Sequence, residues 1–338
     1  MLQLVAKNLK NNLLWYSLGA IALGWGLGLL APSAVAGSQK AIGVASTIVV
    51  FFMIYPMMIN LDLTKLGGIA KSPKPIVLSL VYNFILTPLI SWVLARLFFQ
   101  NHPEIALGFW LVMLIPGSSM SLGYTGLTKG DLGLGAVALG VTFVIVPFAM
   151  PVFMHFLGSA YNVPVPIKSL LTTILLVLIL PMILGDLTRR LIVKRSGKEG
   201  FDRIQPLFSI VTILGLLLIV TLIFFSKSPG LAKQWRMLLL LAVVTFLYLA
   251  IMFPLLTLAD KAFGLSYEQH MGIAFLSTGK NNGTAIAIAV MAFSPLVAIP
   301  AATLPLFQII FSILYVQLAP RIRRLWEVPA NSPREVTR

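Results

Sequence analysis

The feature that most limits the fold of this chain is a series of apolar stretches, each long enough to cross a lipid bilayer. About 20 apolar residues span the roughly 30 Å of hydrocarbon in a membrane. Such stretches recur along all 338 residues, of which 58% are hydrophobic and 10% are charged. A soluble domain usually carries about 25% charged residues. The pattern therefore predicts an all-α protein that crosses the membrane many times.

The apolar stretches predict about ten membrane spans in one domain that covers residues 1–338. Their approximate limits are 12–31, 42–61, 75–98, 105–126, 131–157, 166–188, 205–226, 237–258, 269–293 and 295–320. We expect a linker between two halves at residues 186–204 and a polar tail at residues 321–338. The first stretch is too long for the apolar part of a cleaved signal peptide, and further spans follow it.

Basic residues are distributed unequally between the two sides of the predicted membrane. Most of them lie on the side of the N-terminus, in every second loop and in the tail. Cytoplasmic loops carry an excess of Lys and Arg. We therefore predict a multi-pass protein of the cell (inner) membrane with both termini in the cytoplasm. The net charge of +15 then reflects contact with anionic lipid headgroups of the bilayer rather than with nucleic acid.

The two halves of the chain carry helix-breaking sequences at matching places. The fourth predicted span is interrupted at residues 116–119, and the ninth is interrupted at residues 277–284. Five spans per half is an odd number, so the second half must enter the membrane in the opposite orientation, as in many secondary transporters. We therefore predict two inverted five-helix repeats, over residues 12–157 and 166–320, with helices 4 and 9 discontinuous.

The second break places polar groups in the middle of an apolar stretch. A lysine at a helix centre costs about 2.5–3.5 kcal/mol on insertion scales, so Lys280 should face protein or a water-filled cavity. Gly279 and Gly283 allow the backbone to leave helical geometry, and the freed polar groups can then bind a ligand. Alternatively, Lys280 pairs with backbone carbonyls and only holds the break. The predicted substrate-binding residues here are Lys280, Asn281, Asn282 and Thr284.

The first break begins at Pro116, which removes a backbone hydrogen bond, and Gly117, which permits unusual dihedral angles. The half-helix that follows would point free N–H groups at an anion. Serines in membrane helices often bond only to carbonyls of their own helix, but two breaks at matching places favour a binding site. The predicted binding residues are Gly117, Ser118, Ser119 and Ser121. Other polar side chains that could line a path are Tyr55, Asn60, Asn83, Tyr124, Gln308 and Gln317.

The groups that catalytic and metal sites require are missing from the predicted spans. The chain has no cysteine, and its three histidines do not pair at ligand spacing. All ten acidic residues lie in loops, tails or at span ends, so we expect no carboxylate at mid-membrane. We therefore expect no enzyme activity, no metal site and no cofactor. Lys280 is the intramembrane group that could exchange a proton, which leaves proton coupling open.

Three stretches resemble the bile acid:sodium symporter superfamily and, within it, the arsenite efflux permease branch. They are residues 53–66, 116–131 and 280–289. The resemblance covers nearly the whole chain. It implies a panel domain and a core domain, with the substrate bound where the discontinuous helices 4 and 9 cross.

The chain departs from this family in both of its usual ligand sets. Arsenite permeases usually have a cysteine where this chain has Gly117, and a thiolate is the soft ligand that suits arsenite. Sodium-coupled members usually have a glutamate and a glutamine where Leu276 and Lys280 stand. Leu122, Gly135 and Leu139 also occupy positions where the family implies polar sodium ligands, whereas Ser121 is retained. We therefore expect the sodium sites to be lost and the ammonium of Lys280 to replace the ion.

These observations favour a secondary active transporter that moves a small organic anion by alternating access, without conventional sodium sites. One alternative is an arsenite or antimonite efflux permease, as the branch implies. Another is a sodium-coupled symporter for bile-acid-like or keto-acid substrates. A channel is a further alternative because broken helices also build pores, although no ring-forming repeat or charged filter is found in the sequence.

Overall fold

A computed structural model describes residues 1–64, 73–160, 165–233 and 235–327 of the chain. Within these ranges the backbone is mostly helical and forms no strand. Helices satisfy their backbone groups internally, as the hydrocarbon of a membrane requires. Seven helices in the described ranges are long and apolar enough to cross a membrane. This finding confirms the prediction of a polytopic helical membrane protein.

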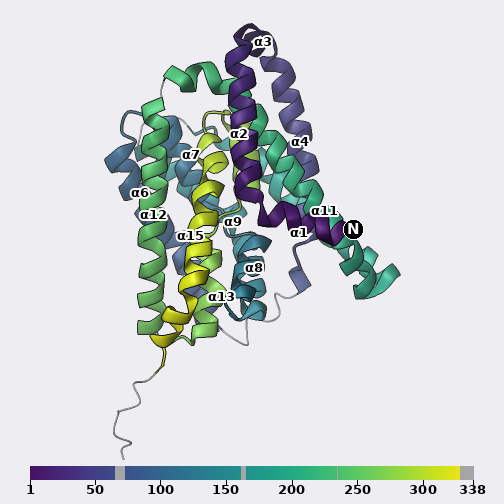
Figure 1. Cartoon of the computed structure of the whole chain (residues 1–338), viewed down its shortest axis with the longest axis vertical. Coiled ribbons are helices and arrows are strands. Elements are labelled where there is room, and N and C mark those ends of the chain that lie inside the picture. Colours follow the sequence, from purple (N-terminus) through teal and green to yellow (C-terminus); the bar gives the residue numbers. More distant parts are fainter. Residues whose placement is uncertain (65–72, 161–164, 234, 328–338) are drawn as a thin grey trace, which may run out of the picture.

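The first bundle consists of three helices, of which the last in the chain packs along the other two, at the right of Figure 1. They are α2 (Leu13–Leu30), α4 (Gln39–Ile59) and α11 (Leu180–Lys233). The short helix α3 (Pro32–Gly37) joins α2 to α4. Gly24 and Gly28 of α2 lie against the backbone of α11, where an added Cβ would collide with it. Small residues allow such close approach of membrane helices.

The second bundle contains the remaining long helices and both helix breaks. Its first-half members are α5 (Pro73–Val81), the π-helical turn η2 (Tyr82–Leu86), α6 (Thr87–Phe98), α7 (Pro103–Leu114), α8 (Ser119–Leu127) and α9 (Leu132–Ala160). Its second-half members are α12 (Trp235–Ala262), α13 (Tyr267–Thr278), α14 (Asn282–Ala292) and α15 (Ile299–Arg324). Helix α10 (Ile167–Ile174) and the turn η3 (Leu175–Ile179) lead from α9 to α11. Helices α14 and α15 also contact α4 and α2 of the first bundle.

The predicted linker at residues 186–204 is helical except at one glycine. Gly197 has φ 69° and ψ 177°, a left-handed combination that glycine adopts without the strain of a side chain. It divides α11 into two arms. At the other end of the chain, α15 continues to Arg324, beyond the predicted span end at residue 320. Residues 328–338 of the predicted tail lie outside the described residues.

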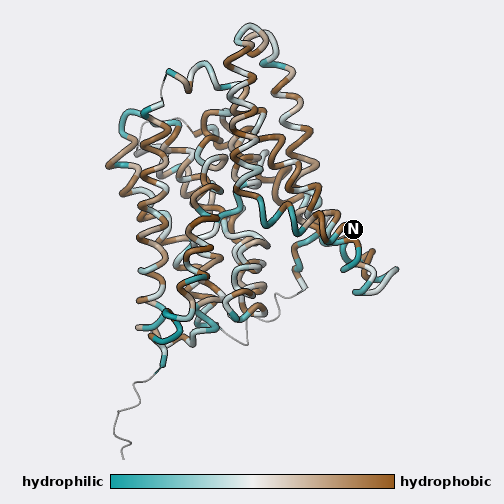
Figure 2. Tube along the Cα trace, viewed as in Figure 1, coloured by the Kyte–Doolittle hydropathy of each residue, from teal (hydrophilic) through white to brown (hydrophobic). Residues whose placement is uncertain are grey.

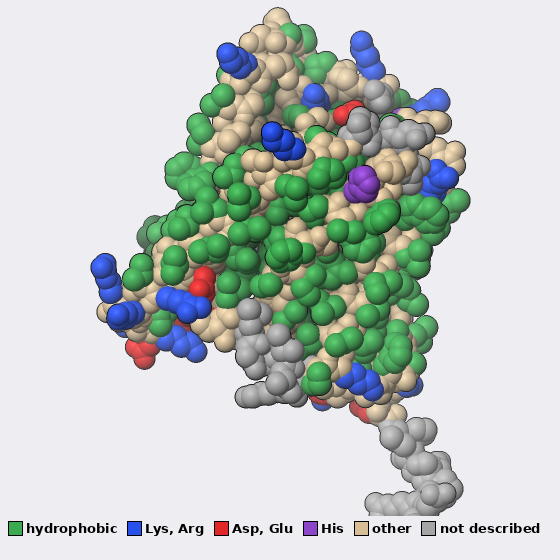
Figure 3. Space-filling view, turned by 180° about the vertical axis from the view of Figure 1, so that it is seen from behind, with side chains coloured by type: hydrophobic (Ala, Val, Ile, Leu, Met, Phe, Trp, Pro, Cys, Tyr) green, Lys and Arg blue, Asp and Glu red, His purple; other side chains and the backbone are tan. Residues whose placement is uncertain are grey.

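The surface has the polarity of a membrane protein. In Figure 3, apolar side chains cover the middle of the visible face, whereas Lys and Arg gather toward its two ends. Figure 2 likewise shows apolar residues along the lengths of the helices. Large side chains such as Phe148 and Leu23 are 72% and 56% exposed, which suits contact with lipid. The orientation of the termini stays a prediction from the basic loops.

Candidate functional site

Two helices of the second bundle are interrupted near the predicted positions. Helix α7 ends at Leu114, and α8 begins at Ser119 after an extended segment that contains Pro116. Helix α13 ends at Thr278, and α14 begins at Asn282. The second break is shorter than the predicted 277–284, because Gly283 already lies within α14.

The two breaks are joined by backbone hydrogen bonds. The N–H of Gly117 donates to the carbonyl oxygen of Leu276 at 3.1 Å, and the N–H of Asn281 donates to the carbonyl oxygen of Pro116 at 2.9 Å. A buried backbone group without a partner is costly, above all where no water can replace it. Each break therefore satisfies polar groups that the other one exposes, and this exchange holds the two segments against each other.

The two breaks approach so closely that there is no room for a side chain at Gly117 or Gly279. A Cβ added at Gly117 would lie 2.9 Å from both the Cα and the carbonyl oxygen of Leu276. The hydroxyl oxygen of Ser121 would lie 3.0 Å from that Cβ and 2.6 Å from one added at Gly279. Ser121 is only 2% exposed. The close contact between the breaks therefore depends on the missing side chain of Gly117 and on the small, buried side chain of Ser121.

Polar side chains stabilise the helix ends at both breaks. The hydroxyl of Ser118 accepts a hydrogen bond from the N–H of Met120 at 3.3 Å at the start of α8. The side-chain oxygen of Asn281 accepts one from the N–H of Thr284 at 3.1 Å at the start of α14. Such caps satisfy N–H groups that have no partner within the helix. The second break has further support from Gln308 of α15, whose side-chain oxygen accepts from the N–H of Lys280 at 3.0 Å.

The ammonium of Lys280 is held inside the second bundle. Lys280 is 1% exposed, and its Nζ donates to the side-chain oxygen of Asn83 at 3.2 Å. Asn83 lies in η2 and donates in turn to the carbonyl of Ser79 at 2.9 Å and to the hydroxyl of Ser277 at 3.2 Å. Lys280 forms no ion pair with a carboxylate in the part of the chain that the structure describes. The buried ammonium is therefore held by a neutral amide, which is itself hydrogen-bonded to Ser79 and Ser277.

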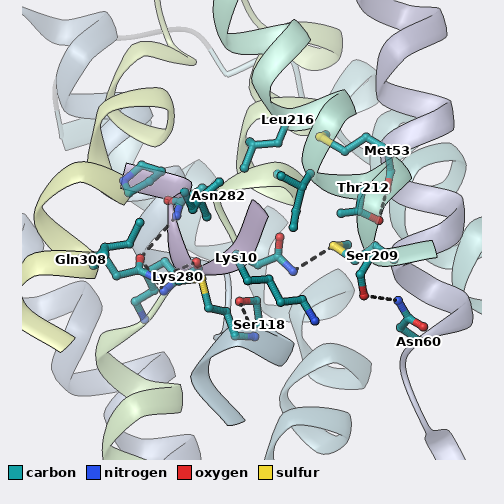
Figure 4. Close-up of a pocket in the computed structure, with 18 residues that line it drawn as sticks. Lys10, Met53, Asn60, Ser118, Ser209, Thr212, Leu216, Lys280, Asn282 and Gln308 are labelled. Atoms are coloured by element: carbon teal, nitrogen blue, oxygen red, sulfur yellow. Dashed lines mark hydrogen bonds between the residues drawn. The ribbon is translucent and has the colours of Figure 1, made fainter. Parts of the chain in front are cut away.

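A cavity opens between the two bundles in front of the second break (Figure 4). The second bundle contributes Ser118, Met120, Lys280, Asn281, Asn282, Gly283, Pro305, Gln308 and Ile309 to its lining. The first bundle and the N-terminal helix contribute Lys10, Leu13, Met53, Met57, Asn60, Ser209, Thr212, Ile213 and Leu216. A binding site between two bundles suits a transporter, because relative movement of the bundles can then open it to either side.

The predicted binding residues separate into two groups in the structure. Four of them line the cavity, namely Ser118, Lys280, Asn281 and Asn282. Gly117, Ser121 and Thr284 are instead buried behind this lining. The side chain of Ser119 lies outside the described part of the structure. Asn60 and Gln308, which the sequence suggested as path-lining residues, also reach the cavity.

Comparison with known families identifies the group to which the chain is related. The family model described as "Sodium Bile acid symporter family" matches residues 47–234, which is more than half of the chain. The chain belongs to the Sodium Bile acid symporter family. This membership confirms the resemblance seen in the sequence and supports a membrane transporter rather than an enzyme.

Several relatives of this symporter family align with most of the chain. "Arsenical-resistance protein Acr3" of Alkaliphilus metalliredigens is 29% identical over 267 residues, which are 76% of this chain and 74% of the relative. "Uncharacterized transporter slr0944" of Synechocystis is 27% identical over 308 residues, 84% of this chain and 80% of the relative. "Uncharacterized sodium-dependent transporter YocS" of Bacillus subtilis is 26% identical over 258 residues, 76% of this chain and 77% of the relative.

The positions where this symporter family implies polar sodium ligands carry apolar packing here. A Cβ added at Gly135 would lie 2.9 Å from a methyl carbon of Leu122 and 3.7 Å from one of Leu276. These leucines therefore occupy the space beside α9, and their side chains offer no oxygen to a cation. A hard cation such as sodium is bound by oxygen ligands. The loss of the sodium sites stays a prediction from the sequence, since the backbone carbonyl oxygen of Gly272 also lies 3.0 Å from the Cβ position of Gly135.

Three polar residues of the cavity were not predicted from the sequence as binding residues. Lys10 lies in the helix before the first predicted span, and its basic neighbourhood suggested only headgroup contact. Ser209 and Thr212 lie on α11, which has no break near them. Their spacing of three places them on one face of that helix. A search for polar pairs at helical spacing within apolar spans would have found these two hydroxyls.

Asp260 lies in the last turn of α12, which ends at Ala262, and so is at a span end as the sequence predicted. The sequence did not predict its burial, since it is 0% exposed. Its two carboxylate oxygens are 2.6 Å from the hydroxyl of Tyr82 and 2.6 Å from Nδ1 of His270. The other ring nitrogen of His270 is 2.7 Å from the hydroxyl of Tyr315. Hydrogen bonding to several helices offsets the cost of burying this carboxylate, a pairing that sequence spacing did not reveal.

Proposed function

We propose that this chain is a secondary active transporter that moves a small organic anion by alternating access. The observation that carries the proposal is the cavity between the bundles, where two helix breaks bring amide and hydroxyl groups together. Ser118, Asn281 and Asn282 would donate hydrogen bonds to the anion. The N-termini of α8 and α14 start at these residues, and helix N-termini favour negative charge.

Lys280 would act as a built-in cation in place of a transported sodium ion. Its ammonium is buried and bonded to Asn83, directly behind the cavity lining. A positive charge there favours an anion in the cavity, and it needs no ion from solution. Removal of a proton from Lys280 would weaken that attraction. Anion binding would then be coupled to the proton on Lys280, and transport would be linked to protons.

The movement would take place between the two bundles, which we equate with the panel and core domains of the family. Ten spans would result if the two arms of α11 crossed separately and if each broken helix crossed once. Two inverted five-helix repeats would then place both termini in the cytoplasm. This arrangement is supported by the kink at Gly197 and by the matching breaks in α7/α8 and α13/α14.

A second candidate function is extrusion of arsenite or antimonite. It is favoured by relatives that are named arsenical-resistance proteins. Two observations speak for the organic anion instead. The chain has no cysteine to bind a soft metalloid. In addition, the position of the usual cysteine is Gly117, where even a Cβ would lie 2.9 Å from the backbone of Leu276.

Uptake by proteoliposomes tests the proposal. The purified protein is tested with radiolabelled pyruvate, 3-methyl-2-oxobutanoate, taurocholate and arsenite, each in sodium and in choline buffer. We expect saturable uptake of a carboxylate in both buffers, and at least tenfold slower uptake by Asn281→Ala. Gly123→Ala serves as the control, because an added Cβ at Gly123 has open space around it.

Melting temperatures provide an independent measure of sodium binding. A ligand that binds the folded state at 100 times its Kd stabilises it by about 2.7 kcal/mol. We expect the same melting temperature for the parent in sodium and in choline. Stabilisation of the parent by sodium, or uptake that requires sodium, would favour the sodium-symporter alternative. Transport of arsenite alone would favour the arsenical-resistance alternative, and single-channel currents would favour a pore.

A further inference from the structure

The N-terminal helix α1 (Leu2–Asn11) lies beside the cavity and is not one of the seven long apolar helices. It runs across the end of α2 and packs against α11 (Figure 1). Its apolar residues Leu2, Leu4 and Val5 are exposed, whereas Ala6 is buried against the protein. A short amphipathic helix of this kind lies in the plane of the membrane interface. Lys10 lies four positions after the buried Ala6 and so shares the side of α1 that is directed at the protein.

Lys10, in the last turn of α1, brings an ammonium to the cavity. It lines the cavity together with Ser118 and Asn281, and its side chain extends among the labelled lining residues in Figure 4. The ammonium of Lys10 forms no hydrogen bond or ion pair with any residue that the structure describes, unlike the ammonium of Lys280. Lys10 as a whole remains exposed, and the protein near its ammonium lowers its pKa from the ordinary value by partial desolvation.

A second, polar pocket continues from Lys10 along α1. Its lining consists of Gln3, Ala6, Lys7, Lys10, Asn11, Gln205, Pro206 and Ser209. Lys10 and Ser209 line both pockets, so the two spaces adjoin. Neither lining contains a carboxylate, whereas both contain lysine. Clefts lined by one sign of charge concentrate ions of the opposite sign.

We propose that Lys10 is the cationic group that the cavity presents to the anionic part of the substrate, and that the pocket along α1 is the route by which the anion reaches it. This inference rests on the proposed function and adds a binding residue to it. Lysines of an interfacial helix ordinarily contact lipid headgroups. Lys10 differs from such lysines because it lines the cavity between the bundles, together with the proposed substrate-binding residues.

The absence of cysteine allows a test that needs no substrate. Ser209→Cys introduces the sole thiol of the chain at the junction of the two pockets. Its rate of modification is measured in nanodiscs with an anionic reagent, 2-sulfonatoethyl methanethiosulfonate, and with a cationic one, 2-(trimethylammonium)ethyl methanethiosulfonate. The ratio of the two rates reports the local electrostatic potential. It is compared in Lys10→Gln, Lys280→Gln and Lys40→Gln backgrounds, where Lys40 lines neither pocket.

We expect Lys10→Gln to lower the ratio of anionic to cationic modification by about threefold, because one charge acts with opposite sign on the two reagents. Lys40→Gln should leave the ratio within about 1.5-fold of the parent, and Lys10→Arg should restore it. Lys280→Gln should lower the ratio less than Lys10→Gln does, because the Lys280 ammonium is bonded to Asn83. An unchanged ratio in Lys10→Gln would overturn the inference, as would an equal decrease in Lys280→Gln.

A thiol at residue 209 that reacts only after denaturation would also overturn the inference, because the pocket would then not admit ions. Should Lys10→Gln prove unstable, the same ratio is measured in two other variants. We expect the parental ratio in Lys10→Arg and a modestly lowered ratio in Lys7→Gln. The labelling does not depend on transport. A protein that shows the Lys10-dependent preference but takes up none of the tested anions would therefore contradict the proposed function alone.

Discussion

The two helix breaks meet each other, yet they are built in different ways. The first depends on the absence of a side chain, because Gly117 lies against the backbone of Leu276. The second depends on the presence of side chains, since Gln308 supports the backbone of Lys280 and Asn281 caps α14. Side-chain hydrogen bonds therefore contribute more to the second break than to the first, although close packing also limits the second break at Gly279. Substitutions should reveal this difference in the size and type of their effects.

The largest loss is expected for Gly117→Val at the first break. Its side chain cannot be placed without moving the backbone of Leu276, and overpacking of this kind costs about 3 kcal/mol. The melting temperature and the uptake of the variant should both decrease strongly. Gly123→Val, on the same half-helix but with open space around it, should retain both. Equal behaviour of the two variants would show that the breaks are not in tight contact.

Gln308→Leu should have the next largest effect, at the second break. It leaves the N–H of Lys280 without its partner at 3.0 Å, and a buried donor without a partner costs about 1–3 kcal/mol. The decrease in unfolding free energy can be measured by denaturant titration in detergent. Gln317→Leu is the matched control, because Gln317 lies exposed on the same helix and should tolerate the change. A similar decrease in unfolding free energy in Gln317→Leu would contradict a specific role of Gln308 at the second break.

Asn281→Ala removes the cap of α14 and should lower the unfolding free energy by about 1 kcal/mol. Its effect on uptake should be larger than this loss of stability suggests, since Asn281 also lines the cavity. Asn281→Asp preserves the cap and should restore the melting temperature without restoring uptake of an anion. Recovery of both properties in Asn281→Asp would argue against an anionic substrate.

Ser118→Ala removes the corresponding cap of α8 and should cost about 0.5 kcal/mol. We expect less than for Asn281→Ala, because the cap distance is 3.3 Å rather than 3.1 Å and the backbone contact at Gly117 remains. Ser118→Thr should behave like the parent in thermal unfolding. A cost above that of Asn281→Ala would reverse the proposed contrast between the two breaks.

Lys280→Met should change stability least, by less than about 0.5 kcal/mol, because it removes the cost of burying an ammonium together with its bond to Asn83. Uptake should nevertheless be lost, since the built-in cation is gone. Thermal unfolding and proteoliposome uptake are measured on the same preparation. A large loss of stability would instead support the alternative that Lys280 only holds the break, and retained uptake would contradict its role in transport.

Much of the architecture follows from short-range features of the sequence. The apolar stretches determined a polytopic helical membrane protein, because hydrocarbon admits backbone only in structures that satisfy their own hydrogen bonds. Proline and glycine at residues 116–119 and 279–283 indicated the breaks, because these residues change local backbone geometry. The motifs at residues 53–66, 116–131 and 280–289 indicated the family. Each of these signals is read within a few neighbouring residues.

The tertiary structure decided what those residues contact. Asn83 and Lys280 lie 197 positions apart, so no local pattern could pair them. The same holds for Asp260 with Tyr82 and for the meeting of Lys10 with Ser118 and Ser209 at one cavity. The direction of a buried side chain depends on which neighbouring helix offers a partner. Packing therefore determines that the Lys280 ammonium lies inside the second bundle, bonded to Asn83, whereas Lys10 lines the cavity.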